Sequence, residues 1–132
     1  MTDTIQPTSQ STTDERLERY MRMWNEPDPD VRRALVQDLW APDARNATPN
    51  MEAVGHDEIM ARVTRSYDLF VGTGEHHFES HEPPVAHHGA VCVTWRMVTG
   101  DGRIAALGHE LLILDDDGRI RSDHQFPVAV PQ

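Results

Sequence analysis

The residues best suited to chemistry near the end of the chain are a histidine and an aspartate, His109 and Asp123. Between them, Asp-Asp-Gly at residues 116–118 is typical of a three-residue hairpin loop whose glycine adopts the left-handed conformation. This loop sets Asp115 opposite Arg119, and the same register makes His109 and Asp123 diagonal neighbours on one face, about 7–8 Å apart at the backbone. An imidazole and a carboxyl group placed together among apolar side chains could act as a general acid and base near neutral pH.

A shorter turn would place these side chains differently. If residues 117–118 alone form the turn, the pairing shifts by one residue and Asp123 points to solvent. The inward side chains of the last strand would then be Ile120, Ser122, His124 and Phe126. The turn residues favour the longer loop, so we predict that Asp123 faces inward. Even in that register, a histidine and an aspartate can form a purely structural pair.

Composition excludes several other classes of protein. The chain has 132 residues, with 22 acidic and 12 basic side chains and a formal net charge of -10, which disfavours nucleic-acid or membrane partners. All basic residues are arginine, so lysine Schiff-base chemistry, pyridoxal phosphate anchoring and a Walker-type phosphate lysine are excluded. The lone cysteine, Cys92, excludes an internal disulfide and cysteine-based zinc sites.

Two polar clusters could suggest a metal site. Imidazole is a ligand for zinc, nickel and copper, but we expect the histidines between residues 76 and 88 to be solvated near a sheet edge. Three aspartates at residues 115–117 lack the ligand spacing and terminal glutamate of an EF-hand, and we expect them to form a turn. We therefore predict no metal. The histidines are His76, His77, His81, His87 and His88.

We predict a disordered polar tail over residues 1–13 and a single folded domain over residues 14–132. The tail lacks the positive and apolar regions of a secretion signal, and no apolar run is long enough to cross a membrane. We expect a cytoplasmic protein.

Three helices are expected at the start of the domain. The first, over residues 12–24, begins with a Thr-x-x-Glu capping box and has apolar residues at helical spacing. The second, over residues 28–41, begins with an aspartate N-cap followed by proline, and a proline ends it. The third, over residues 55–70, follows a glycine and carries the apolar stripe Ile59, Val63, Tyr67 and Phe70.

From residue 76 the apolar period changes to that of strands, with runs near residues 76–82, 90–98, 103–114 and 119–128. Helices followed by a strand meander predict an α+β domain with helices packed on one face of an antiparallel sheet. The expected inward face carries Val91, Val93, Trp95, Met97, Leu107, Leu111 and Ile113, together with His109 and Asp123. An apolar strip on the outer face, which could join two subunits as a homodimer, consists of Leu112, Leu114, Ile120 and Phe126.

Side chains on the inward faces could line a pocket for a flat ligand, although each is also an ordinary core residue. The candidate substrate-binding residues are Tyr20, Trp24, Val63, Tyr67, Val93, Trp95, Leu107 and Leu111.

The element order, with Gly-His-Asp-Glu-Ile at residues 55–59, Gly-His at residues 108–109 and Asp-Gly-Arg-Ile at residues 117–120, resembles the SnoaL-like polyketide cyclase family. That family belongs to the nuclear transport factor 2-like superfamily, and the resemblance runs from about Asp14 to Phe126. It implies a cone-shaped α+β barrel, in which a curved sheet wraps a helix and leaves an apolar cavity open at one end. Dimers are common in the superfamily.

The resemblance also implies an activity. SnoaL-like cyclases use a histidine on the penultimate strand and an aspartate on the last for acid-base work in an aldol ring closure, without metal or cofactor. His109 and Asp123 match these positions in type and order. By implication, Asp123 removes a proton next to a carbonyl and His109 polarises the developing enolate. The expected protein is a cofactor-independent cyclase or isomerase acting on a small hydrophobic carbonyl compound.

Other activities of the same fold are alternatives. A noncatalytic ligand-binding or dimerisation module would keep the cavity and do no chemistry. Epoxide hydrolases of the superfamily use an Asp-Arg-Asp relay around a water, but Arg96 falls on the opposite face from Asp123. Steroid isomerisation is less expected. Tyr20 could match the tyrosine that ketosteroid isomerases of the superfamily carry on the first helix, but residues 43–48 offer no convincing base.

Overall fold

The computed structural model describes residues 5–130, with side chains from residue 13 onward. The helices are α1 (Ile5–Asn25), α2 (Pro29–Leu39) and α3 (Gly55–Ser66), and a π-helical turn, Tyr67–Val71, extends α3. Helix α1 begins before the predicted capping box, within the segment expected to be a tail, of which residues 1–4 lie outside the described part. No helix among the described residues combines the length and apolar character needed to span a membrane.

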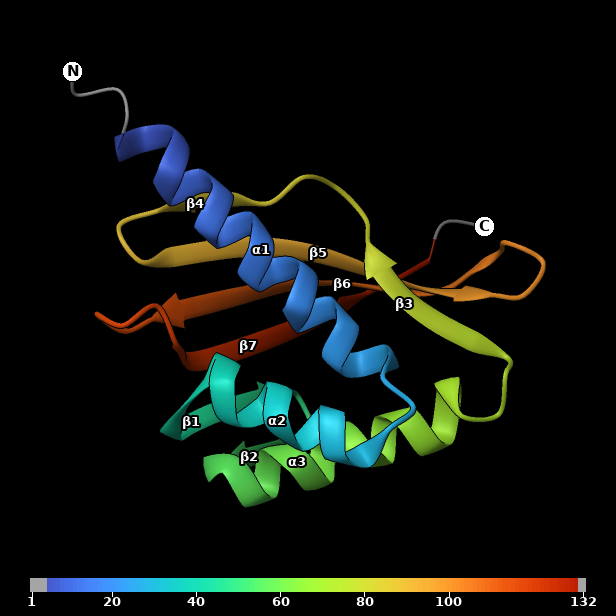
Figure 1. The fold of residues 1–132 in the computed structure, drawn as a ribbon. Helices are drawn as coiled ribbons and strands as arrows, with labels where there is room; N and C mark the ends of the chain where they lie inside the picture. Colours follow the sequence, from blue (N-terminus) through green and yellow to red (C-terminus); the bar gives the residue numbers. More distant parts are fainter. Residues whose placement is uncertain (1–4, 131–132) are drawn as a thin grey trace.

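Within residues 5–130, seven strands form one mixed sheet in the order β2-β1-β7-β6-β5-β3, with β4 paired to β5. Strands β1 and β7 are parallel, whereas the other neighbours are antiparallel. Helix α1 crosses one face of the sheet, and α2 and α3 lie beside β1 and β2 (Figure 1). The expected α+β fold, with helices packed on a curved mixed sheet, is confirmed. The strands are β1 (Trp40–Thr48), β2 (Met51–Val54), β3 (His76–Ser80), β4 (Val85–His87), β5 (Ala90–Thr99), β6 (Ile104–Leu114) and β7 (Ile120–Val128).

Polar side chains fix the positions of the helices. Asp28 caps α2 by accepting a hydrogen bond from the backbone of Asp30, as predicted for its N-cap. Buried Arg32 donates to the carbonyl oxygens of Glu26 and Pro27 and to the hydroxyl of Thr64, which ties the α1–α2 connection to α3. These bonds give hydrogen-bond partners to the guanidinium of Arg32, which is a buried charged group.

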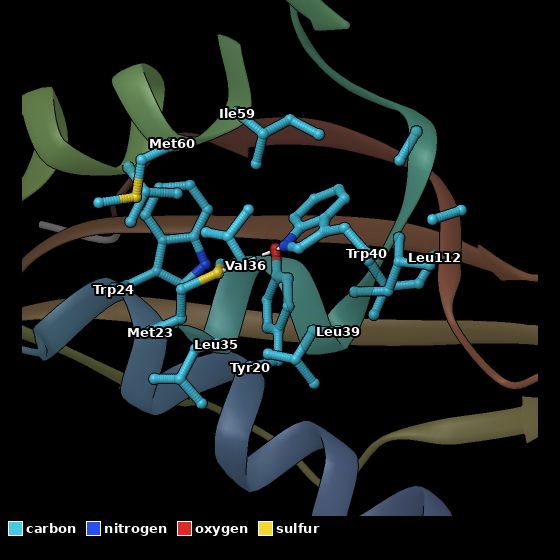
Figure 2. Close-up of a cluster of buried hydrophobic side chains, with 14 of the residues drawn as sticks. Tyr20, Met23, Trp24, Leu35, Val36, Leu39, Trp40, Ile59, Met60 and Leu112 are labelled. Atoms are coloured by element: carbon cyan, nitrogen blue, oxygen red, sulfur yellow. Dashed lines mark hydrogen bonds between the residues drawn. The ribbon is translucent and has the colours of Figure 1, made fainter. Parts of the chain in front are cut away.

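The hydrophobic core lies between the helices and the sheet. The ring of Tyr20 in α1 contacts both Trp24 of the same helix and Trp40, the first residue of β1, and the three rings are shown together in Figure 2. The indole nitrogen of Trp40 contacts the sulfur of Met23 at 3.3 Å. Aromatic side chains of this size bury a large apolar area, and they fix the position of α1 over the sheet.

The hairpin between β6 and β7 has the predicted loop but a different register beyond it. The backbone of Asp115 donates to Arg119, and Gly118 has a φ of 81°. A β-bulge then inserts Arg121, because Leu114 pairs with Ile120 whereas the next pair is formed by residues 113 and 122. Beyond the bulge Asp123 lies opposite Leu112, one residue away from the partner that an uninterrupted register from the Asp115–Arg119 pair would give.

A second bulge, between β5 and β6, has the same effect on β6. Val98 pairs with Ile104 but Met97 pairs with Ala106, so Ala105 is the extra residue. The inward face of β5 is as predicted, and even-numbered residues of β6 face it, since Glu110 lies opposite Val93. The predicted inward orientation is therefore wrong for His109, Leu107, Leu111 and Ile113, which lie on the outer face.

The outer face of the sheet also differs from the prediction. Leu112 and Ile120, expected in an exposed strip, are buried in the core. Phe126 is exposed as expected, and Leu111 and Val128 are exposed with it. The homodimer stays a prediction.

Gly108 provides room for an aromatic ring. It lies opposite Trp95, and a Cβ atom at Gly108 would stand 2.3–2.6 Å from three atoms of the Trp95 indole. We expect Gly108→Ala to displace this ring and to lower the free energy of unfolding by about 1–3 kcal/mol. Denaturant unfolding followed by tryptophan fluorescence measures both effects. Gly100→Ala is the matched control, because a Cβ there meets nothing within 4 Å; equal effects of the two substitutions would contradict the prediction.

Candidate functional site

Two carboxyl groups and a phenol meet in the interior. The hydroxyl of Tyr20 lies 2.6 Å from Oδ2 of Asp123 and 2.7 Å from Oε1 of Glu110. All three side chains are buried, with exposed fractions of 1%, 0% and 2% for Tyr20, Asp123 and Glu110. The bulges make this possible, because they place Glu110 on the same sheet face as Asp123.

Counting protons shows how the three groups must share them. A phenol has one proton and can donate it to one carboxylate only. The second short contact requires a proton on one carboxyl group, which then donates to the tyrosine oxygen. The cluster therefore holds two protons and one negative charge when both hydrogen bonds are made.

The environment raises the pKa of all three groups. Burial, and next the charge of Asp123, raise the pKa of Glu110 well above its ordinary value. Burial also raises the pKa of Asp123, to about 6, against hydrogen bonds from Tyr20 and other neighbours that lower it. Burial and the two carboxylates raise the pKa of Tyr20. At neutral pH the proton thus resides mainly on Glu110 and the negative charge on Asp123.

Asn46 of β1 holds the ionised carboxyl group from the other side. Its Nδ2 donates to Oδ2 of Asp123 at 3.0 Å, because the parallel pairing of β1 with β7 sets the two residues beside each other. The Oδ1 atoms of both residues are buried without a hydrogen-bond partner. The site thus carries more acceptors than donors next to Asp123.

The network continues from Glu110 toward α3. Gln125 donates to Oε1 of Glu110 at 2.8 Å, and its own carbonyl oxygen lies 3.4 Å from a terminal nitrogen of Arg62. The guanidinium of Arg62 also lies 5.2 Å from the centre of the Trp24 ring. Burial lowers the pKa of Arg62, although the nearby acidic groups favour its charged form. A cation therefore lies close to the Glu110 carboxyl group.

Glu110 and Arg62 both line a partly open cavity of about 160 Å³. Asp123 and Tyr20 are not among the lining residues, so Glu110 stands between them and the cavity. The walls are otherwise mostly aromatic and thioether side chains, which suit a flat apolar ligand. The remaining lining residues are Met21, Trp24, Ser66, Phe70, Phe78, Trp95, Met97, Ala106 and Gln125.

Local irregularities position two of these aromatic rings. Phe70 belongs to the π-helical turn after α3, a geometry that is frequent at functional sites. Phe78 is fixed by Asn25 at the end of α1, whose amide both donates to and accepts from the Phe78 backbone at 2.8 Å. The Phe70 and Phe78 rings meet edge to face.

The structure brings together only some of the predicted site residues. Trp24 and Trp95 line the cavity, and Asp123 faces inward as predicted. His109 is exposed on the outer face and lies opposite Phe126, so the predicted pair of His109 with Asp123 does not form.

The other candidates lie elsewhere. Val63 and Val93 are core residues, and Tyr67 lies beneath the guanidinium of Arg32 at 4.5 Å. Leu107 and Leu111 lie on the outer face of β6. None of these five lines the cavity.

Sequence reasoning missed Glu110, Arg62, Asn46 and Gln125. Strand β6 is apolar at both odd and even positions, so alternation alone does not decide whether His109 or Glu110 faces inward. The available signal was Gly108, a residue without a side chain in the strand that faces a tryptophan. Pairing Gly108 with Trp95 would have placed Glu110 inward.

The predicted histidine cluster is spread along the edge of the sheet. His77 contacts Glu79 at 3.0 Å, and the rings of His87 and His88 touch each other. In the described part of the chain, no three side chains of histidine, cysteine, aspartate or glutamate converge in a way that could hold a metal ion.

Comparison with known proteins identifies similar domains. The model of a family described as SnoaL-like domain matches residues 17–122. No curated protein matches the chain. A presumed isomerase of the SnoaL-like family from Agrobacterium tumefaciens str. C58 is 28% identical with a TM-score of 0.81, over 90% of this chain and 99% of that one.

More distant solved structures share the fold. A presumed polyketide cyclase from Sinorhizobium meliloti is 15% identical with a TM-score of 0.65, over 84% of this chain and 93% of its own. An NTF2-like protein of unknown function from Exiguobacterium sp. 255-15 is 17% identical with a TM-score of 0.65, over 87% of this chain and 99% of its own.

Asp123→Asn tests the cost of the buried charge. The folded-state pKa of Asp123 is about 6 against an ordinary value of 3.8, so this carboxyl group destabilises the fold by about 3 kcal/mol as pH rises from 4 through 6, and not below. We expect the neutral variant to unfold with a free energy about 1–3 kcal/mol higher than the wild type at pH 8, and nearly equal at pH 4.

Urea unfolding at the two pH values measures the difference. Asp116→Asn is the control, since Asp116 is exposed in the β6–β7 loop, and it should change neither value. An Asp123→Asn variant that is less stable than the wild type to the same extent at both pH values would contradict the expected charge cost.

Proposed function

Because this chain belongs to the family of SnoaL-like domains, we propose that it is a cofactor-independent enzyme of the cyclase or isomerase type that acts on a small hydrophobic carbonyl compound. One observation carries the proposal: a carboxyl group, Glu110, stands in the wall of an aromatic-lined cavity and is backed by two further buried acids. Glu110 is the residue we assign to proton transfer, in the place that the sequence suggested for His109.

Glu110 and Arg62 divide the chemistry between them. Removal of a proton next to a carbonyl leaves negative charge on the carbonyl oxygen, and a preorganised cation stabilises that charge most when water is excluded. Arg62 lines the cavity with Glu110, so a carbonyl oxygen near the guanidinium would present its α-carbon to the carboxyl group. Glu110 then exchanges the proton that the reaction moves.

The cavity favours a compact, flat substrate. Its volume of about 160 Å³ is close to that of cavities that accept a single aromatic ring. The rings of Trp24, Phe78 and Trp95 succeed one another with edge-to-face or tilted contacts, which suits a planar apolar ligand. One similar structure is described as a presumed isomerase and another as a presumed polyketide cyclase, and both descriptions are compatible with a reaction of this class.

Two alternatives have less support. A noncatalytic module would not need buried acids, whose charge lowers the stability of the fold. The relay of an epoxide hydrolase would need an arginine beside Asp123, but Arg96 makes an ion pair with Glu79 on β3.

Glu110→Gln tests the activity. The probe is 2-indanone, a flat ketone with acidic α-protons, and NMR in D₂O measures their exchange for deuterium. We expect the wild type to accelerate exchange above the buffer rate, and Glu110→Gln to lower the enzymatic rate by about 100-fold or more, the range for loss of a general acid or base. Arg62→Met should lower the rate as well, because the enolate loses its cation.

His109→Ala is the matched control, since this exposed side chain lies on the other face of the same strand. It should exchange 2-indanone at the wild-type rate. A wild-type protein without exchange activity, or a fully active Glu110→Gln variant with an unchanged melting temperature, would refute the proposed function.

A further inference from the structure

We propose that Asp123 acts as the proton reservoir of the site and exchanges its proton with Glu110 through the hydroxyl of Tyr20. This inference rests on the proposed function and adds to it: the group that touches the ligand would differ from the group that finally holds the proton. Tyr20 and Asp123 are then relay residues, and Glu110 alone meets the substrate.

The positions of the three residues support this division. Asp123 has an exposed fraction of 0% and does not line the cavity, whereas Glu110 does. The Tyr20 hydroxyl, at 2.6 and 2.7 Å from the two carboxyl groups, bridges them. Hydrogen bonds this short with acidic partners on both sides allow a hydroxyl to accept one proton as it gives up its own.

The neighbouring amides orient the relay. Asn46 donates to the same Asp123 oxygen that Tyr20 contacts, and Gln125 donates to the same Glu110 oxygen. Oε1 of Glu110 thus points toward the relay, which leaves Oε2 for a ligand in the cavity. The two carboxyl groups present one oxygen each to the phenol, and the direct hydrogen bond between them is the competing path that the variants below distinguish.

The proposed step balances as follows. The α-carbon of the ketone gives its proton to Oε2 of Glu110, and the electron pair of the broken C–H bond becomes the enolate. The proton on Oε1 of Glu110 moves to the oxygen of Tyr20, and the phenolic proton moves to Oδ2 of Asp123. Glu110 and Tyr20 end with as many protons as they began with, and Asp123 has gained one.

The charge moves in a favourable direction during this step. Before it, the negative charge is on Asp123, which makes no ion pair within the described part of the chain and which burial destabilises. After it, the charge is on the enolate oxygen beside Arg62, the charged group of α3 that lines the cavity. Among the described residues, the titratable groups that interact with the relay are Arg62 and the relay members themselves, which lie on α1, β6 and β7. The reverse path returns the proton to a different carbon of the substrate, which is an isomerisation.

Kinetic analysis of two variants tests the relay. With 2-indanone as the probe, we expect Tyr20→Phe and Asp123→Asn each to lower the maximal exchange rate by about tenfold or more, while KM changes by less than about twofold because neither residue lines the cavity. Tyr67→Phe removes the other tyrosine hydroxyl of the chain and should leave both constants unchanged. Melting temperatures exclude loss of fold as the cause.

The outcomes separate the relay from the proposed function. If Glu110→Gln is inactive but Tyr20→Phe and Asp123→Asn exchange at the wild-type rate, Glu110 works alone and the relay is refuted. If Asp123→Asn is slow and Tyr20→Phe is not, the proton passes directly between the carboxyl groups, which refutes the role of Tyr20. If KM rises as much as the rate falls, both residues only shape the cavity. Failure of the proposed function itself would instead be seen as an active Glu110→Gln variant.

Discussion

One phenolic proton between two buried carboxyl groups constrains the chemistry of this protein. Tyr20 contacts both Glu110 and Asp123 within 2.7 Å, and it can satisfy only one of them as a donor. The cluster must therefore retain a carboxylic proton at neutral pH, inside a fold that buries all three side chains. A carboxylic acid kept neutral at pH 7 can donate a proton there, whereas an exposed glutamate is already ionised at that pH.

The sheet and the helices each contribute part of this arrangement. Two β-bulges turn the even side of β6 inward and bring Glu110 opposite Gln125 and diagonal to Asp123. Helix α1 supplies the phenol, and its end is fixed to β3 by Asn25. Parallel pairing of β1 with β7 supplies Asn46. Four separate segments thus have to pack correctly before the acids meet.

The buried carboxylate of the site lowers the stability of the fold. Burying an ionised carboxylate costs free energy, and the hydrogen bonds from Tyr20 and Asn46 recover part of that cost. The surrounding core of Met23, Trp40 and other large apolar residues supplies the hydrophobic stabilisation that allows it. A carboxyl group with a raised pKa in a cavity wall, as at Glu110, is typical of sites that do chemistry, because function gains from groups that a purely structural core would leave out.

The sequence by itself determined the α+β class, the order of the helices and main strands, and the three-residue loop between β6 and β7. Local signals carry these features: apolar period, capping residues and turn glycines act over a few residues. Only the tertiary structure decided which face of β6 is inward. A single bulge residue, Arg121 or Ala105, reverses every side chain beyond it, and nothing local marks either residue as extra. This long-range choice of register places Glu110, and not the predicted His109, in the site. The packing of Trp95 against Gly108 fixes that register.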